Sequence, residues 1–353
     1  MMPQNISHKG TKEDTKTLSF LGAFVSSLVP LCEIVLLSLI FMVGGASAQK
    51  KPTPIDVNKH VLIINGAGGD AVYAHQFEEW TEQLRSSLCE RFGFDRRNFR
   101  ILSEKGDAPA TAEEVKKTFA TLKSELDANN VLFVFLIGHG SFDGKESKFN
   151  LVGPDLSASE YNVLLTSLPT RRVVVFNMSS ASGEFIKSLA AKGRIVITAT
   201  RNGQETNATR FAGFFILALN AADADTDQDG HTSVLEAFVY ANRLTGDFYK
   251  RAGRLATEHA LLDDNGDGVG HDKVEAGEGL LARATYLDSL SVDEAAATAA
   301  TGRLLKERTR LEGEIEQLIA RKANMQEAEY EATLERLFIE LAKVNRSIKQ
   351  AGT

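Results

Sequence analysis

The sequence predicts an α/β fold built on a largely parallel sheet with helices on both faces. From residue 60 to residue 219, strand-like stretches alternate with stretches of helical periodicity. The strand-like stretches are apolar at consecutive positions, which is typical of strands buried on both faces. The 353 residues contain 43% hydrophobic and 25% charged side chains, an ordinary globular composition with room for one large domain and an appendage.

Five strands and the helices that follow them are expected in order. The predicted strands are 60–66, 99–103, 131–138, 171–177 and 193–200. An amphipathic helix runs through Phe92, a second opens with Thr111 and Glu114 at capping-box spacing, and a short one starts near Ser157. Because strands followed by helices build a parallel sheet, ligand chemistry is expected at the carboxyl ends of the strands.

Residues 1–48 have the order of a secretory signal. Basic side chains precede a ten-residue apolar run, 34–43, and Ala46-Ser47-Ala48 offers a small-residue cleavage site. The long first region also carries Glu13 and Asp14, so an uncleaved N-terminal anchor stays open as the alternative. Both interpretations predict an extracytoplasmic protein, periplasmic or secreted.

Charge and cysteine content argue against a nucleic-acid-binding protein and against a protein stabilised by disulfides. The net charge of −7 and the absence of a concentrated basic face argue against nucleic acid as a partner. Of the two cysteines, Cys32 would leave with the signal, and the lone Cys89 can form no intramolecular disulfide.

The chain divides into four parts. The signal or anchor, 1–48, is followed by an α/β domain at 57–250 and a glycine- and aspartate-rich irregular connection at 251–291. Residues 292–350 are predicted to form a coiled-coil-like helical hairpin. The hairpin either packs on its own domain or serves self-association or partner docking. Its heptad positions are Leu304, Leu311, Leu318 and Met325, then Leu334, Leu341 and Ile348.

Two strand ends carry the residues with catalytic potential. The strand 131–138 ends in Gly138-His139-Gly140, and the next strand runs into a cluster of serines around Ser180. If the two ends are neighbours, Ser180 could act as a nucleophile and His139 as its general base. The backbone N–H of Gly140 could then stabilise an oxyanion.

The order and spacing of these residues resemble the caspase-like fold, and most closely the legumain-type cysteine peptidases. In "INGAGGDAVYAHQFEEW", Tyr73, His75 and Gln76 match that family's Asn-Tyr-Arg-His-Gln segment. His139-Gly140 matches its catalytic His-Gly pair, and "MSSASG" at 178–183 falls on its Glu-Ala-Cys-Glu-Ser-Gly. The resemblance covers about half of the chain, from His60 to the region before Asp225. It implies a caspase-like three-layer fold and a peptide or protein as substrate or ligand.

Four departures fall on functional positions of that family. Ser180 replaces the catalytic cysteine, and Val72 replaces the asparagine that orients the histidine. Ala74 and Met178 replace two residues of the substrate pocket. A serine hydroxyl is far harder to ionise than a thiol, so it needs a well-held base. A catalytically silent relative that binds peptide or protein is therefore one hypothesis, and an active hydrolase using Ser180 and His139 is the alternative.

The segment "DTDQDGHTSVLE", 225–236, has the ligand spacing of an EF-hand calcium loop. Gly230 provides the turn at the sixth position, and helical patterns flank the loop on both sides. Oxygen ligands at this spacing favour Ca²⁺ in a structural role. The predicted ligand positions, from first to twelfth, are Asp225, Asp227, Asp229, His231, Ser233 and Glu236.

A second acidic segment, "DDNGDGVGHD", reproduces only the first half of such a loop. Asp263, Asn265 and Asp267 occupy the first, third and fifth positions, but the twelfth is Val274 and Glu275 comes one residue late. It is predicted to be an acidic turn with weak affinity for Ca²⁺.

Overall fold

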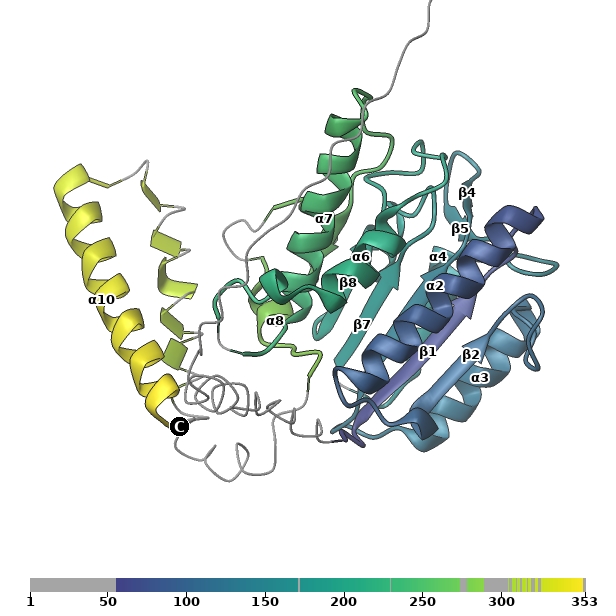
Figure 1. The fold of residues 1–353 in the computed structure, drawn as a ribbon, viewed down its shortest axis with the longest axis horizontal. Coiled ribbons are helices and arrows are strands. Elements are labelled where there is room, and N and C mark those ends of the chain that lie inside the picture. The colour runs from purple at the N-terminus through teal and green to yellow at the C-terminus, as the bar shows by residue number, and fades with distance from the viewer. Residues whose placement is uncertain are drawn as a thin grey trace, which may run out of the picture. The chain divides into compact units, whose positions relative to one another are not determined.

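A computed structural model describes residues 55–170, 172–228, 230–273 and 278–288. In the C-terminal segment it describes 304, 307–308, 310–311, 313–315, 317–318, 321–322 and 325–351. A six-stranded sheet with the order β2-β1-β3-β7-β8-β9 forms the centre of the α/β part (Figure 1). The strands are β1 (Lys59–Asn65), β2 (Phe99–Leu102), β3 (Val131–Ile137), β7 (Arg172–Asn177), β8 (Arg194–Thr198) and β9 (Leu261–Asp263).

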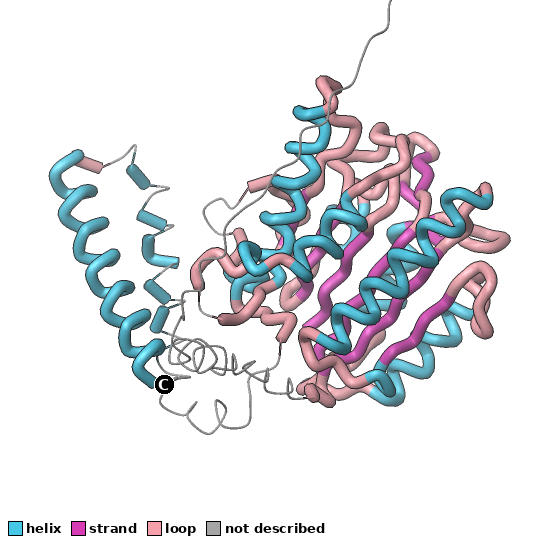
Figure 2. Tube along the Cα trace, viewed as in Figure 1, coloured by secondary structure: helices cyan, strands magenta, loops and turns pink. Residues whose placement is uncertain are grey.

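All neighbouring strands of this sheet are parallel except β9, which runs antiparallel to β8 at the edge. Each of the five predicted strands is present. The predicted α/β class with a mostly parallel sheet is therefore confirmed, and Figure 2 shows the strands lying side by side between helices.

Helices cover both faces of the sheet, which gives the three layers expected for a caspase-like fold. One face packs against α2 (Ala71–Glu90), α6 (Phe211–Asn220) and α7 (Val234–Arg251). The other packs against α3 (Ala112–Glu125), α4 (Ala158–Thr166) and α5 (Phe185–Leu189). Short 3₁₀ turns occur at Arg96–Asn98 and Ala222–Ala224.

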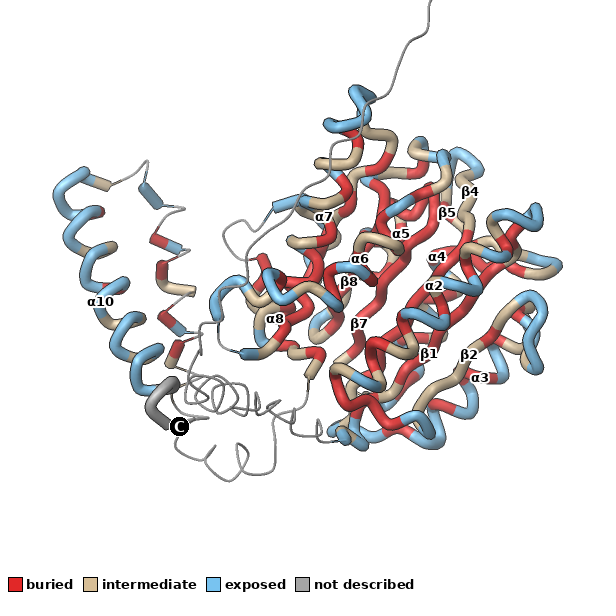
Figure 3. The backbone as a smooth tube through the Cα atoms, in the orientation of Figure 1, coloured by how far each residue is buried: buried red, intermediate tan, exposed pale blue. Residues whose placement is uncertain are grey.

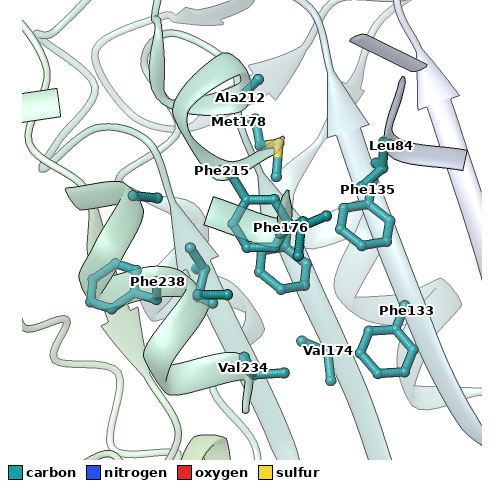
Figure 4. Packing of buried hydrophobic residues seen from close by; sticks show 14 of the residues in the cluster. Leu84, Phe133, Phe135, Val174, Phe176, Met178, Ala212, Phe215, Val234 and Phe238 are labelled. Atoms are coloured by element: carbon teal, nitrogen blue, oxygen red, sulfur yellow. The ribbon is translucent and has the colours of Figure 1, made fainter. Parts of the chain in front are cut away.

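The two-sided burial explains why the strand sequences are apolar at consecutive positions. In β1, Val61 and Ile63 face one hydrophobic cluster, whereas Leu62 and Ile64 face the other. Figure 3 shows the strands buried along most of their length. On the side of α6, the rings of Phe135 and Phe176 stack with centroids 4.8 Å apart, as Figure 4 shows.

Side-chain caps fix the starts of several helices. Thr111 accepts a hydrogen bond from the backbone of Glu114 at the start of α3, as its spacing predicted. Ser157 and Ser233 make complete capping boxes at the starts of α4 and α7. These local signals were readable in the sequence because each cap involves residues only three positions apart.

Several short elements were not expected from the sequence. The loop after β3 forms a three-stranded antiparallel sheet of β4 (Gly140–Phe142), β5 (Ser147–Phe149) and β6 (Leu156–Ser157). The segment 251–291, expected to be irregular, supplies β9 and the short helix α8 (Leu280–Arg283). Strands of two or three residues are too short to produce a periodic pattern.

In the C-terminal segment, helical residues between 304 and 321 precede α10 (Glu327–Ala351). Leu311, Ile315 and Leu318 pack with Tyr330 and Leu337 of α10 in a hydrophobic cluster of their own. The predicted signal or anchor, 1–48, lies outside the described residues. Among the helices that the structure describes, none combines the length and apolarity needed to cross a membrane.

Candidate functional site

The ends of β3 and β7 meet at the carboxyl edge of the sheet, as the parallel topology requires. The hydroxyl of Ser180 accepts a hydrogen bond from the N–H of Gly140 at 3.1 Å. The same hydroxyl donates to the carbonyl oxygen of Gly140, also at 3.1 Å. Ser180 and Gly140, predicted from separate motifs, are therefore direct neighbours, and the Ser180 hydroxyl is paired with the backbone of Gly140 on both sides.

The serine-rich segment after β7 is buried throughout. Ser179 and Ser182 are 0% exposed and Ser180 is 2% exposed. The Ser179 hydroxyl donates to Oδ1 of Asn177 at 2.6 Å, and the Ser182 hydroxyl lies 3.1 Å from that of Thr200. The three hydroxyls are thus held by internal hydrogen bonds.

Two neighbouring segments cover the serine-rich segment. From the β4–β5 hairpin, the Ser147 hydroxyl donates to the carbonyl oxygen of Ala181 at 2.5 Å. From the loop after β8, the carbonyl oxygen of Glu205 accepts from the Ala181 N–H at 2.8 Å. Thr209 of the same loop donates to the carbonyl oxygen of Met178 at 2.6 Å. The carbonyl oxygen of Met178 and both backbone polar groups of Ala181 are therefore used within the fold.

Glycine is required at two positions of this contact. A Cβ atom at Gly140 would lie 2.3 Å from the carbonyl oxygen of Ser180. A Cβ atom at Gly183 would lie 2.2 Å from the backbone nitrogen of Asn202. Because both obstacles are backbone atoms, only glycine permits these approaches.

His139 is half-buried between the sheet edge and α2. Its ring makes edge contacts with Tyr73 and Phe77, with centroids 4.7 and 5.1 Å away. Burial lowers the pKa of His139 below its usual value, although a hydrogen bond to the backbone of Gly68 and the nearby charge of Asp70 act in the opposite direction. Burial thus favours the neutral imidazole, the form that a general base needs.

The structure does not join His139 to Ser180. Within the described residues, no hydrogen bond links the imidazole to the serine hydroxyl, which is occupied by Gly140. The N–H of Gly140, the expected oxyanion donor, is used by Ser180 as well. A substrate carbonyl would have to displace both hydrogen bonds before Ser180 could attack it.

The first segment that resembles the peptidase pattern, residues 72–76, lies on α2. Tyr73 contacts His139 directly, whereas His75 has a largely exposed side chain. Val72 is 75% exposed, and Ala74 is buried. The aromatic support of His139 by Phe77 was not apparent from the sequence, where Phe77 reads only as part of the apolar face of a helix.

The first acidic loop brings three of its predicted ligands together. Asp225, Asp227 and Glu236 each offer a carboxylate oxygen within 4.8 Å of the others. Oδ2 of Asp225 accepts from the N–H of Gly230 at 3.0 Å, and Gly230 has a φ of 87°, a conformation that favours glycine. Asp229 lies outside the described residues.

The second half of this loop merges with the start of α7. Ser233, the ninth position, is the N-cap, and Glu236, the twelfth, closes its capping box. The side chain of His231 turns to Asp288, with Nδ1 2.6 Å from Oδ2. At this position an EF-hand loop uses the backbone carbonyl, so the orientation of the ring does not matter for binding. The donor set of carboxylate, hydroxyl and carbonyl oxygens fits Ca²⁺.

The second acidic loop contains a residue that sequence reasoning missed. Asp263 ends β9 and is 1% exposed, and its group of carboxylates includes Asp267 and Glu278. Glu278 stands outside the twelve-residue spacing, so no local signal pointed to it. Burial raises the pKa of Asp263 and raises that of Glu278 to about 8. Glu275 lies outside the described residues.

Comparison with known proteins adds little to this geometry. No family model and no curated protein matches the chain. The crystal structure of protein GSU0716 from Geobacter sulfurreducens is similar at 14% identity, with a TM-score of 0.40, over 58% of this chain and 92% of that chain. A similarity of this degree assigns no activity to the chain.

Proposed function

We propose that this chain is an exported protein that uses a peptidase-like α/β fold to bind peptide or protein, and that the hydrolytic activity of the fold has been lost. The observation that carries the proposal is the burial and hydrogen bonding of Ser180. Its side chain is 2% exposed, and its hydroxyl is paired with both backbone groups of Gly140. A hydroxyl in this position ties two strand ends together and is not presented to a ligand.

The ligand would bind over the carboxyl edge of the sheet, where α/β folds usually bind their ligands. Val72 is an exposed apolar side chain at the start of α2. The next residue, the half-buried Tyr73, contacts the ring of His139. An aromatic and aliphatic surface of this kind suits the side chains of an extended peptide. The predicted role of the C-terminal hairpin in self-association or docking stays a prediction.

Calcium would stabilise the domain by binding to the acidic loop 225–236. The ion would be held by Asp225, Asp227 and Glu236, with Asp229, Ser233 and the carbonyl oxygen of His231 as further ligands by spacing. Because Glu236 belongs to the first turn of α7, a bound ion would fix the start of that helix.

The alternative is an active hydrolase, and one observation favours it. Burial favours the neutral form of His139, and this residue adjoins Gly140, which contacts Ser180. In this case Ser180 would attack a substrate carbonyl while His139 took the hydroxyl proton and later returned it to the leaving amine. The segment 178–182 would first have to open.

The test compares the wild-type chain with Ser180→Cys, both carrying Cys89→Ser so that no other thiol of the mature chain interferes. We expect the wild type to show no turnover of a diverse peptide library and no labelling by a serine-directed phosphonate. Because position 180 is buried, the Ser180→Cys thiol should react with iodoacetamide far more slowly than the Cys89 thiol of the unmodified chain. Peptidase activity that appears only in Ser180→Cys would indicate a surviving geometry with a lost nucleophile.

Binding is tested on the same peptides when they are immobilised. We expect the wild type to be retained and Val72→Asp to be retained less, because the substitution places a charge on the apolar surface. Equal retention of Val72→Asp and of a control, Val163→Asp on the exposed side of α4, would argue against binding at this edge. Robust turnover by the wild type would refute the loss of activity.

A further inference from the structure

Glu278 is buried with one carboxylate oxygen unpaired. The side chain is 2% exposed, and its Oε1 atom has no hydrogen-bond partner among the described residues. The nearest basic group joined to it is Nε2 of His271, at 3.9 Å and beyond hydrogen-bond range. A buried carboxyl oxygen without a hydrogen-bond partner is costly, and such an atom in a native fold calls for a partner.

The unpaired carboxylate belongs to a group with the spacing of a metal site. Asp263, Asp267 and Glu278 each offer a carboxylate oxygen, and these oxygens lie within 4.8 Å of one another. Asp263 and Glu278 are both almost fully buried. Three carboxylates converge here, and within the described residues no lysine or arginine pairs with them.

The backbone around Asp263 repeats the arrangement of the first loop. In the first loop, the carboxylate at position one accepts from the N–H of Gly230 at position six, at 3.0 Å. In the second, Oδ2 of Asp263 accepts from the N–H of Gly268, also at position six and at 3.0 Å. The side chains of Asn265 and Asp267 each accept from a backbone N–H two residues on, at 2.8 Å. The two loops therefore share the hydrogen bond from the N–H at position six to the carboxylate at position one.

A fourth carboxylate, that of Asp264, lies next to Glu278, and burial together with this carboxylate raises the pKa of Glu278. Both oxygens of Asp264 are used at the start of α8, where they accept from the N–H groups of Gly279 and Ala282 at 2.8 and 2.7 Å. The N–H of Asp264 donates to Oε2 of Glu278 at 3.2 Å. Asp264 thus anchors the segment that carries Glu278 against the loop, and Oε1 of Glu278 is left for another partner.

We infer that the loop beginning at Asp263 binds a second calcium ion, with Glu278 as the distal carboxylate ligand in place of a residue at position twelve. Asp263, Asn265, Asp267 and Glu278 present only oxygen, the donor that Ca²⁺ and Mg²⁺ prefer. Two of the carboxylates lie in the loop and the third, that of Glu278, comes from a later segment. This arrangement favours the larger Ca²⁺, which accepts irregular geometry. This inference is independent of whether Ser180 is catalytic.

The test is calcium binding by isothermal titration calorimetry on the chelator-treated full chain. We expect two ions per wild-type chain and one in Glu278→Gln. Removal of this ligand should weaken the site by more than the roughly tenfold that loss of an outer-shell partner costs. Glu275→Gln is the matched control, because Glu275 is nearest to position twelve in sequence, and it should retain both ions.

The first loop is assigned separately with Glu236→Gln, which should remove the other ion. If the wild type binds a single ion and Glu236→Gln abolishes it, the second site does not exist. Calcium binding by Glu278→Gln that equals the wild type would also overturn the inference. Mg²⁺ or Zn²⁺ that displaces Ca²⁺ from this site at equal concentration would refute the choice of cation.

Thermal unfolding separates a metal ligand from a structural residue. With chelator present, Glu278→Gln should unfold at the same temperature as the wild type or higher, because it removes an unpaired buried carboxylate. In saturating Ca²⁺ it should unfold at a lower temperature than the wild type. A lower unfolding temperature under both conditions, or a variant that does not fold even with chelator present, would mean that Glu278 serves the fold alone and would overturn the inference.

Discussion

Replacement of Ser180 by alanine removes the hydroxyl that joins the ends of β3 and β7. The N–H and the carbonyl oxygen of Gly140 then lose their 3.1 Å partner together. Each buried polar group left without a partner costs about 1–3 kcal/mol. Because Gly140 is only half-buried, water can replace part of the loss, and we expect a decrease in the free energy of unfolding of about 2–3 kcal/mol in total.

Thermal and urea unfolding followed by circular dichroism measure this decrease. For a domain of this size, about 2–3 kcal/mol corresponds to a fall in Tm of roughly 4–12 °C. Ser141→Ala is the control, because Ser141 lies next to Gly140 and its hydroxyl makes no hydrogen bond within the described residues; it should change stability by no more than about 0.5 kcal/mol.

The reasoning is refuted if Ser180→Ala is as stable as Ser141→Ala. The hydroxyl would then contribute nothing to the fold, which is the behaviour of a side chain kept for chemistry. A loss of peptidase activity in Ser180→Ala without a loss of stability would support the hydrolase alternative directly.

Three further predictions follow from the site and its surroundings. The pKa of His139 in the folded state lies below its value in the unfolded chain. Between these two pKa values the unfolded chain binds more protons, so the free energy of unfolding rises with pH up to about 6.5. Urea titrations should show this rise in the wild type and less of it in His139→Phe, and a His139 pKa above about 6.5 measured by NMR would contradict the prediction. Gly183→Ala forces a Cβ against the backbone of Asn202 and should cost about 3 kcal/mol or more, whereas Gly246→Ala, in open space on α7, should be neutral or stabilising in the same unfolding assay. Ca²⁺ at about a hundred times its Kd should stabilise the wild type by about 2.7 kcal/mol per site. Glu236→Gln should lose the stabilisation that comes from the first loop. A Tm that does not respond to Ca²⁺ would argue against calcium binding by either loop.

Sequence alone determined the features that depend on neighbours along the chain. Consecutive apolar residues identified the strands, since a strand covered on both faces needs no polar alternation. Capping residues such as Ser157 fixed helix starts over three positions, and the spacing 225–236 identified an acidic loop whose carboxylates do converge. The order of strands and helices allowed the ends of β3 and β7 to be neighbours, and the pairing of these two strands in the sheet makes them so.

Tertiary structure decided which groups the functional side chains contact. The sequence placed His139 and Ser180 at the ends of two successive predicted strands. The partner of the Ser180 hydroxyl is nevertheless the backbone of Gly140, because the glycine allows an approach too close for any side chain. Glu278 joins Asp263 across a segment whose length no motif specifies. Hydrogen-bond partners and metal ligands drawn from separate segments depend on the packing of those segments, and spacing along the chain does not encode that packing.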